Sequence, residues 1–394
     1  MSTFAEIIKK REKDWNSPGL MDRAKAEKID KIPFSSPLVN WMSYGGIPRG
    51  RVTEFYGEPG SGKSTSAIDI CKNAIEIFKE EFDTQIAELM KDESKNSDEI
   101  EELMERGHRK VLYLDVEHGF DAKWSETLGI NMDEIEIMQP PNIPAEDLLQ
   151  TVMELIETGE VGLVVIDSIP SLVTRSELEK KLGEKTVASL AGLMTVFMRK
   201  IVSLLTRNNC TMILINQIRD NMENPYKDNT PGGQAVKFYC STRMMFRLGN
   251  PVDFLGNELP QKTENPAGYL VTVRLVKQKT APFDRKNGTY FLMCQSGIRP
   301  DFDYAKLAID KYGIIKKGGA WFSICDPYTK HPLETSDPLN PEKTKPVKVN
   351  GMSKVYEYLE TNHEYYDRLR KFIVDDINGS DTEENSDGEA NEVL

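Results

Sequence analysis

The sequence predicts an α/β fold built on a mostly parallel central sheet. Three short apolar runs, at residues 110–115, 162–167 and 211–216, are nearly continuous and rich in Val, Ile and Leu. Strands of this composition are covered on both faces. Helical patterns lie between them, and strands that alternate with helices form a parallel sheet. A phosphate-loop motif at residues 57–65 follows a further predicted strand and precedes a helix, which is the setting that the motif requires.

The chain has 394 residues, a length that suits a large central domain with smaller flanking modules. Residues 1–31 are polar and helix-prone, with a break at Ser17–Pro18–Gly19, and are expected to form an N-terminal helical arm. The core is expected to span residues 32–325. It begins with a strand at 51–56, the phosphate loop, and a helix at about 63–78.

An acidic stretch at residues 79–108 interrupts this pattern. It holds eleven acidic residues against four basic ones, and apolar residues recur in it at helical spacing. We therefore expect a charged helical hairpin inserted between a helix and the next strand.

After the core we expect a proline-containing linker at 326–346, a small helical module at 347–374 and a disordered acidic tail at 375–394. The tail holds eight acidic residues and neither Lys nor Arg. Together with the stretch at 79–108 it carries more negative charge than the net −13 of the whole chain. The remainder is therefore close to neutral and compatible with local basic surfaces for nucleic acid. Charge alone fits acidic residues that serve solubility equally well.

Several classes of protein are disfavoured. No apolar run approaches the ~20 residues of a membrane-spanning helix, and residues 1–15 lack the apolar stretch of a signal peptide. We expect a cytoplasmic protein with no membrane partner. The five cysteines and four histidines are dispersed along the chain. This predicts reduced thiols and no cysteine or histidine metal site.

The phosphate loop is the most specific motif in the chain. It comprises Gly57, Glu58, Pro59, Gly60, Ser61, Gly62, Lys63, Ser64 and Thr65. Its glycines let the backbone wrap a phosphate, and the amides at the helix N-terminus offer donors. Lys63 adds a positive charge and the Ser64 hydroxyl can bind magnesium. The motif in this setting predicts ATP and Mg²⁺ as cofactors rather than a glycine-rich turn without a nucleotide.

Polar residues that end three of the strands complete a candidate site. Asp167 ends the second apolar run and can anchor the magnesium shell through water. Glu117 follows the first run and can orient or activate an attacking water. Gln217 closes the third run and opens into a long polar loop, so it can couple the nucleotide state to loop order. Taken alone, these residues also fit a helix cap, a solvated carboxylate and a strand cap.

Several runs, taken in order, resemble bacterial RecA recombinases and their phage-encoded relatives over about residues 30–325. The runs are GIPRGRVTEFYG at 46–57, DVEH at 115–118, VIDS at 165–168, INQIR at 215–219, GGQAVKFY at 232–239, VKQK at 276–279 and GAWF at 319–322. The resemblance implies a RecA-type ATPase core, flanked by an oligomerisation arm and a C-terminal helical module.

The resemblance also implies roles for individual residues. Glu117 is similar to the family's water-activating carboxylate and Gln217 to its γ-phosphate sensor. Lys277 and Lys279 resemble a pair that a neighbouring subunit directs at the phosphates. The remaining matches are Asp121 and Trp124, where the family holds the adenine, and Phe238, at an apolar subunit contact. Trp124 replaces a Tyr, and an indole can stack there too.

Two DNA-facing loops of the family correspond to about residues 178–190 and 219–233. Candidate DNA contacts there and nearby are Lys180, Lys181, Lys185, Arg199, Arg219, Lys227 and the pair Gly232 and Gly233. A solvated basic face is the alternative for the lysines. Residues 79–108 are an insertion relative to the family, which usually has almost no residues at this place.

The resemblance implies an ATP-dependent protein that forms a homo-oligomeric filament on single-stranded DNA and pairs it with homologous duplex DNA. Single-strand-binding and loader proteins are further candidate partners. A hexameric helicase of the same core fold is the alternative enzyme. A DNA-coating scaffold that uses ATP only for assembly is the non-catalytic one.

Overall fold

A computed structural model describes residues 3–15, 29–181, 184, 189–218, 230–337 and 340–379. Its centre is a nine-stranded mixed sheet with the strand order β11-β10-β9-β8-β3-β7-β6-β4-β5. The six strands from β8 to β5 are parallel to one another. Beyond β8, each of β9, β10 and β11 runs antiparallel to the strand before it in the sheet. The expected α/β fold with a mostly parallel sheet is confirmed.

The strand bounds agree with the apolar runs in the sequence. In sheet order the strands are β11 (Gly297–Ile298), β10 (Asn287–Met293), β9 (Gly268–Gln278), β8 (Thr242–Val252), β3 (Val52–Gly57), β7 (Thr211–Gln217), β6 (Val161–Asp167), β4 (Lys110–Asp115) and β5 (Ile135–Met138). β6 is buried throughout and β7 up to its last residue, because helices cover both faces of the sheet at this point.

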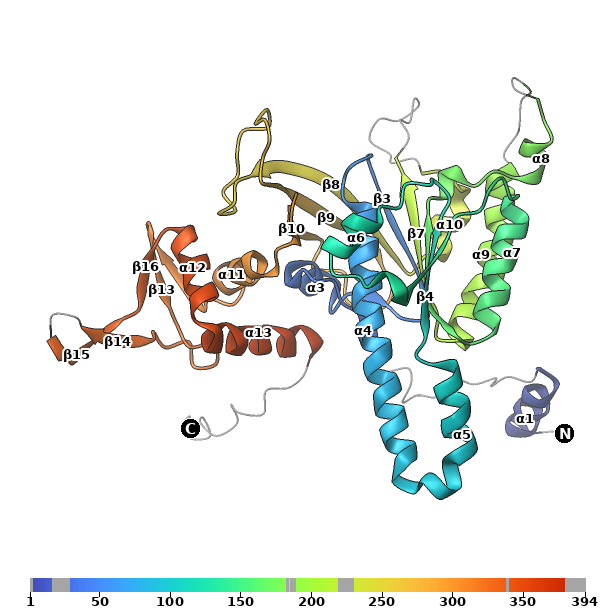
Figure 1. The fold of residues 1–394 in the computed structure, drawn as a ribbon, viewed down its shortest axis with the longest axis horizontal. Helices are drawn as coiled ribbons and strands as arrows, with labels where there is room; N and C mark the ends of the chain where they lie inside the picture. Colours follow the sequence, from blue (N-terminus) through green and yellow to red (C-terminus); the bar gives the residue numbers. More distant parts are fainter. Residues whose placement is uncertain are drawn as a thin grey trace.

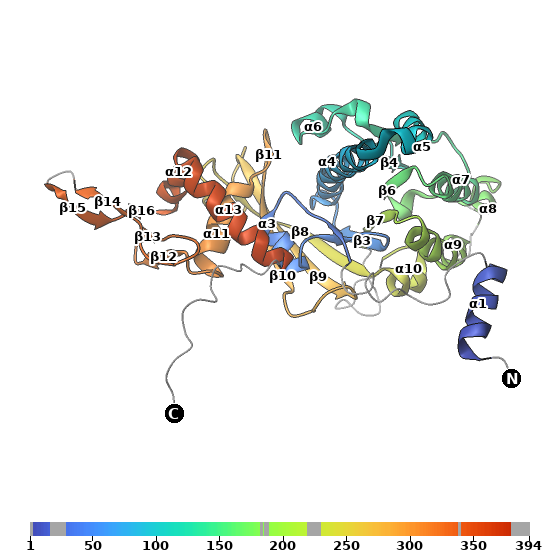
Figure 2. The same ribbon diagram turned by 90° about the horizontal axis from the view of Figure 1, so that it is seen from below.

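Helices lie on both faces of the parallel strands (Figures 1 and 2). One face carries α3 (Pro37–Ser43), α4 (Lys63–Leu89) and α6 (Ala122–Thr127), and the other carries α7 (Ala145–Glu157), α9 (Ser189–Arg207) and α10 (Gly233–Tyr239). Successive residues of a strand point to opposite faces. Thus Phe55 of β3 belongs to the first apolar cluster and Val52 to the second.

Helix α9 is long and apolar enough, by length and composition, to cross a membrane, and it is alone in this among the described helices. Its apolar side is buried against the sheet through Met194, Phe197 and Ile201. The apolar residues on this side of α9 therefore belong to the core.

The charged stretch 79–108 is helical and projects from the sheet (Figure 1). Its first arm is the continuation of α4, which runs without a break from the phosphate loop to Leu89. The 3-10 turn η1 (Met90–Asp92) joins it to α5 (Glu93–Arg106). At its base the guanidinium groups of Arg49 and Arg109 both lie over the Phe78 ring, 5.4 and 5.7 Å from its centroid. These contacts fix the root of the hairpin to the core.

Short elements complete the N-terminal half. They are α1 (Phe4–Trp15), β1 (Lys31–Ile32), β2 (Ile47–Pro48), η2 (Met132–Glu134), η3 (Ile169–Ser171) and α8 (Arg175–Leu178). The end of the predicted arm joins the core, because β1 pairs with β2 in a two-stranded sheet.

The C-terminal region differs from the predicted boundaries. Strands β12 (Ile315–Gly318) and β13 (Trp321–Ile324) fall in the range assigned to the core. They pair with each other, and β13 also pairs with β16 (Lys348–Asn350), in a separate three-stranded sheet. Helices α11 (Pro300–Asp310), α12 (Met352–Thr361) and α13 (His363–Asn378) share one apolar cluster with it. The C-terminal module therefore begins before residue 325.

The predicted linker and tail also need correction. Residues 326–346 contain a hairpin of β14 (Glu334–Asp337) and β15 (Asn340–Pro346), and Pro346 is tolerated because both strands are edge strands. Helix α13 continues to Asn378, past the predicted start of the tail at residue 375, because Ile377 is buried in the C-terminal cluster. The rest of the predicted tail, residues 380–394, lies outside the described residues.

Candidate nucleotide and DNA site

The phosphate loop joins the last residue of β3 to the first turn of α4. Gly60 and Gly62 have φ angles of 70° and 91°, a region that favours glycine. Gly57 lies against β8, where a Cβ would stand 2.2 Å from the Phe246 carbonyl oxygen. Gly62 is the N-cap of α4 and offers no side chain to the first-turn amides. Those amides are therefore left to bind an anion.

Tyr290, which no motif in the sequence indicates, supports this loop from β10. Its hydroxyl group lies 2.7 Å from the Ser66 hydroxyl and donates to the Gly62 carbonyl at 3.4 Å. Burial raises the pKa of the Tyr290 phenol, so it stays neutral. No local motif marks this residue, because it is 224 residues from Ser66 in the sequence.

Lys63 and Asp167 face each other across the loop. The Lys63 ammonium group donates to the Glu58 carbonyl at 2.7 Å, and burial lowers its pKa while Asp167 and Glu117 oppose that shift. Burial raises the pKa of Asp167, although hydrogen bonds from Tyr113 and Ser64 work in the opposite direction. The structure thus brings both predicted magnesium ligands, Ser64 and Asp167, into contact. Among the described residues there is no group of three or more His, Cys, Asp and Glu side chains that could hold a metal.

Glu117 lies at the same edge of the sheet, on the turn after β4. Its backbone N–H and that of Val116 donate to the Asp167 carbonyl, at 3.2 and 2.7 Å. Its carboxylate accepts hydrogen bonds from the Ser168 hydroxyl and, at 3.0 Å, from the Gln217 amide. The predicted catalytic carboxylate and the predicted sensor are therefore in direct contact.

Asp115 shapes the turn that carries Glu117. It is almost completely buried and accepts hydrogen bonds from the Gly119 and Phe120 amides, at 3.1 and 2.9 Å, and from the Gln139 side chain at 2.8 Å. The sequence places it at the end of a strand and assigns it no separate role. Its burial shows that it holds the turn.

The two residues predicted at the adenine differ in their surroundings. Asp121 caps α6, where its carboxylate accepts the Trp124 backbone N–H at 3.0 Å. The Trp124 indole is half-buried and donates to the Thr65 hydroxyl at 3.4 Å. Trp124 thus lies beside the phosphate loop, and Asp121 positions the helix that carries it.

Lys277 and Lys279, the edge lysines, lie far from the phosphate loop of their own chain. Gly57, at the end of β3, is beside Phe246 of β8, which pairs with Val273 of β9. Lys277 is further along β9 and pairs with Arg243. Four residues along a strand span ~13 Å, and two strand spacings of ~4.8 Å also intervene. Within one chain, the edge lysines and the loop belong to opposite edges of the sheet.

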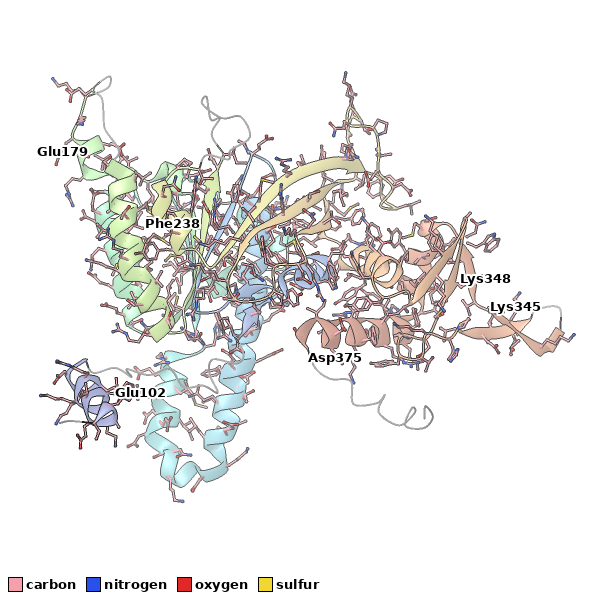
Figure 3. The ribbon with its side chains drawn as sticks, turned by 180° about the vertical axis from the view of Figure 1, so that it is seen from behind. Glu102, Glu179, Phe238, Lys345, Lys348 and Asp375 are labelled. Atoms are coloured by element: carbon pink, nitrogen blue, oxygen red, sulfur yellow. The ribbon has the colours of Figure 1, made fainter. Side chains whose placement is uncertain are left out.

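The edge lysines bind the C-terminal end of α10. Lys277 donates to the Lys237 and Phe238 carbonyls at 2.6 and 2.8 Å, and Lys279 donates to the Phe238 carbonyl at 3.1 Å. Burial and the neighbouring Lys279 lower the pKa of Lys277 to about 8. The Phe238 side chain is 70% exposed on the same helix (Figure 3). Phe238 is therefore a surface residue and not part of the core.

The two predicted DNA loops start and end at the carboxyl edge of the sheet. Gly232 and Gly233 begin α10 with φ angles of 88° and 78°, and a Cβ on Gly233 would stand 3.0 Å from that of Ala191, in the first turn of α9. The C-terminal ends of both loops thus lie side by side. Figure 3 places Glu179, at the start of the first loop, far from Glu102 on the hairpin.

The structure brings together only some of the basic residues that were predicted to contact DNA. Lys180 and Lys181 are exposed beyond α8. Arg199 is also exposed, but it follows the first residue of α9 by ten residues, or ~15 Å. Lys185, Arg219 and Lys227 lie outside the described residues. The structure therefore brings the glycine pair to the loop ends but places Arg199 well along α9.

A strand, phosphate loop and helix at the carboxyl edge of a parallel sheet define a P-loop α/β protein. The family model of the RecA N-terminal domain matches residues 97–299. The RecA protein of Ruminococcus albus is 32% identical over 306 residues, which cover 77% of this chain and 66% of that protein. The RecA protein of Thermus thermophilus is 31% identical over 322 residues, or 80% and 82% of the two chains.

A match to the RecA protein of Thermus aquaticus extends over more of the chain. It is 29% identical over 379 residues, which cover 95% of this chain and 94% of that protein. The chain belongs to the RecA family of recombination proteins.

Proposed function

We propose that this protein is an ATP-dependent recombinase that forms filaments on single-stranded DNA and promotes homologous pairing and strand exchange with duplex DNA. DNA binding would stimulate its ATP hydrolysis. One observation carries the proposal: Gln217, the last residue of the strand that leads into a predicted DNA loop, donates to the Glu117 carboxylate at 3.0 Å. The proposed catalytic carboxylate is therefore in contact with the strand that leads into the proposed DNA loop.

The residues at the carboxyl edge fit a magnesium nucleotide. The uncapped first turn of α4 offers N–H donors, Lys63 offers a positive charge, and Ser64 with Asp167 offers oxygen ligands. Trp124 provides an aromatic surface beside Thr65 for the base. When bound, the magnesium ion neutralises charge that develops on the phosphates.

Glu117 suits the role of water-orienting carboxylate. Its hydrogen bonds with Ser168 and Gln217 hold it beside Asp167 without burying it in an apolar pocket. The carboxylate can accept a proton from a water held in line with the terminal phosphate. Gln217 can exchange its bond to Glu117 for one to that phosphate, which would move the start of the following loop.

The site is completed by a neighbouring subunit. The edge lysines cannot reach the phosphate loop of their own chain, so they serve the nucleotide of the next copy, with Phe238 in the contact between copies. A contact between opposite edges of one domain is head-to-tail, and it gives an open helix when the rotation does not close. The N-terminal arm, residues 1–31, is a further candidate for this contact.

A joint-molecule assay tests the proposal. Circular single strands, a homologous linear duplex, ATP and Mg²⁺ should yield joint molecules with the natural protein, and a heterologous duplex of equal length should not. Lys63→Ala should yield none. Absence of joint molecules despite confirmed DNA binding and ATP hydrolysis would contradict the recombinase proposal.

The same reagents separate the alternatives. A hexameric helicase would displace a strand from a forked duplex without a homologous single strand. A scaffold would coat DNA and bind ATP without DNA-stimulated turnover.

A further inference from the structure

A buried ion pair lies in the sheet between the phosphate loop and the edge lysines. Glu54 of β3 has no exposed surface, and its carboxylate accepts a hydrogen bond from the Arg243 guanidinium of β8. The guanidinium also stacks on the Tyr56 ring, 4.7 Å from its centroid. A charge buried in this way is costly unless it is paired. Glu54 and Arg243 therefore hold each other in place.

Asn216 connects this pair to the DNA loop. Its side-chain amide donates to Glu54 at 2.9 Å and to the Pro231 carbonyl at 3.0 Å. Its carbonyl oxygen accepts the Gln217 backbone N–H at 3.0 Å. One side chain thus contacts the buried pair, the C-terminal end of the second loop and the predicted sensor.

The same network lies beneath helix α10. Glu54 and Asn216 share the parity of Val52 and Met212, so they point to the face that α9 and α10 cover. The first residues of α10 follow Pro231, which Asn216 holds, and its last carbonyls accept from the edge lysines. The helix is anchored to the network at one end and to the edge lysines at the other.

We propose that Glu54 and Asn216 are positioning residues that couple the 219–233 loop to the edge lysines through α10. The inference rests on the proposed function and adds residues that touch neither nucleotide nor DNA. In the described state the edge lysines bind α10 carbonyls. To reach a neighbour's phosphates they exchange those carbonyls for phosphate oxygens, which releases the C-terminal end of α10.

The position of α10 then decides how readily this exchange occurs. A change in the loop moves Pro231, Asn216 passes the change to Glu54 and Arg243, and Arg243 pairs with Lys277 in the sheet. Contiguous contacts alone do not establish coupling between two sites. The test must therefore measure coupling and not stability.

Two variants interrupt the network at different points, and a third serves as control. Asn216→Ala removes the link to Pro231 and keeps the ion pair. Glu54→Gln keeps the shape and removes the charge. Thr53→Val is the matched control, because Thr53 is equally buried on the same strand and its hydroxyl has no hydrogen-bond partner among the described residues.

The measurement is ATP hydrolysis with and without single-stranded DNA, alongside single-strand affinity and thermal unfolding. We expect Asn216→Ala and Glu54→Gln to lower the stimulation by DNA about fivefold or more, as coupling energies of this kind do. DNA-independent hydrolysis and single-strand affinity should stay within about twofold. Thr53→Val should behave as the natural protein.

Two results would overturn the inference. Full stimulation in the folded Asn216→Ala variant would show that the loop does not act through this side chain. A parallel fall of stimulation, basal hydrolysis and melting temperature would assign the network a structural role only. If the natural protein itself shows no stimulation by DNA, the proposed function fails instead.

Discussion

The two edges of the central sheet differ in what they contain. At the carboxyl edge, hydrogen bonds join Glu117 to the Asp167 carbonyl and to Gln217, and the charge of Lys63 interacts with both carboxylates. The opposite edge holds the edge lysines and an exposed Phe238, with no phosphate loop near them. Under the proposed function, the first edge binds the nucleotide and the second completes the site of another copy.

This division separates binding from turnover. Under the proposed function, a single subunit holds ATP, whereas full hydrolysis requires the opposite edge of a neighbour. Variants of the two edges should therefore fail in different assays.

The largest effect is expected at the carboxyl edge. Lys63→Ala should reduce ATP hydrolysis by about 10²-fold or more, because a preorganised charge on the phosphates is lost. The unfolding transition should stay close to that of the natural protein, since Lys63 makes its hydrogen bonds within the loop. Steady-state hydrolysis and thermal unfolding check this, and undiminished turnover would remove Lys63 from the site.

Variants of the opposite edge should be defective in assembly. Phe238→Ala should weaken ATP-dependent self-association about tenfold or more, because an exposed aromatic anchor is lost from the interface. ATP binding by the isolated subunit should not change. Light scattering and equilibrium nucleotide binding separate the two, and Val196→Ala, which alters another exposed apolar residue, is the control. Normal assembly of Phe238→Ala would place the interface elsewhere.

A smaller effect, on ATP binding, is expected at Trp124 of the carboxyl edge. Trp124→Ala should weaken ATP binding by an isolated subunit about fivefold and change saturated turnover less, because the stacking surface is lost. Trp124→Tyr should retain most of the affinity. Nucleotide titrations of the three proteins provide the measurement. Equal affinity in all three would make Trp124 a packing residue only.

The smallest effect is a pH dependence at the opposite edge. The pKa of Lys277 is lowered to about 8, so its charge is present below that pH and is lost as pH rises through it. ATP-dependent assembly should weaken about two- to threefold between pH 7 and pH 9, because the neutral amine binds phosphate less well. Lys277→Arg should remove this dependence, since a guanidinium stays charged. An identical pH profile in both proteins would exclude Lys277 as its source.

The sequence predicted the parts of the site that depend on local order. The phosphate loop, Asp167 and Glu117 are all set by a strand and the turn that follows it, and parallel strands bring their carboxyl ends together. Glu54 and Tyr290 could not be found in this way. Their partners Arg243 and Ser66 are 189 and 224 residues distant, and only the folded sheet brings them together.

The predicted domain boundaries were wrong where contacts between residues far apart in the sequence determine the structure. Ile377 extends α13 into a segment whose composition is acidic, because the C-terminal cluster buries it. The strand β13 belongs to the C-terminal sheet because its partner β16 lies beyond the predicted linker. Neither contact is visible in a local window of sequence.

Mixing two inactive variants tests the central claim, that each nucleotide site is shared between copies. Lys63→Ala lacks an intact phosphate loop at the carboxyl edge, and the double variant Lys277→Ala, Lys279→Ala lacks the edge lysines at the opposite edge. In an equal mixture that assembles at random on single-stranded DNA, about a quarter of the interfaces pair an intact loop with intact lysines. ATP hydrolysis should then recover well above that of either variant alone. No recovery in filaments shown to contain both variants would contradict a shared site.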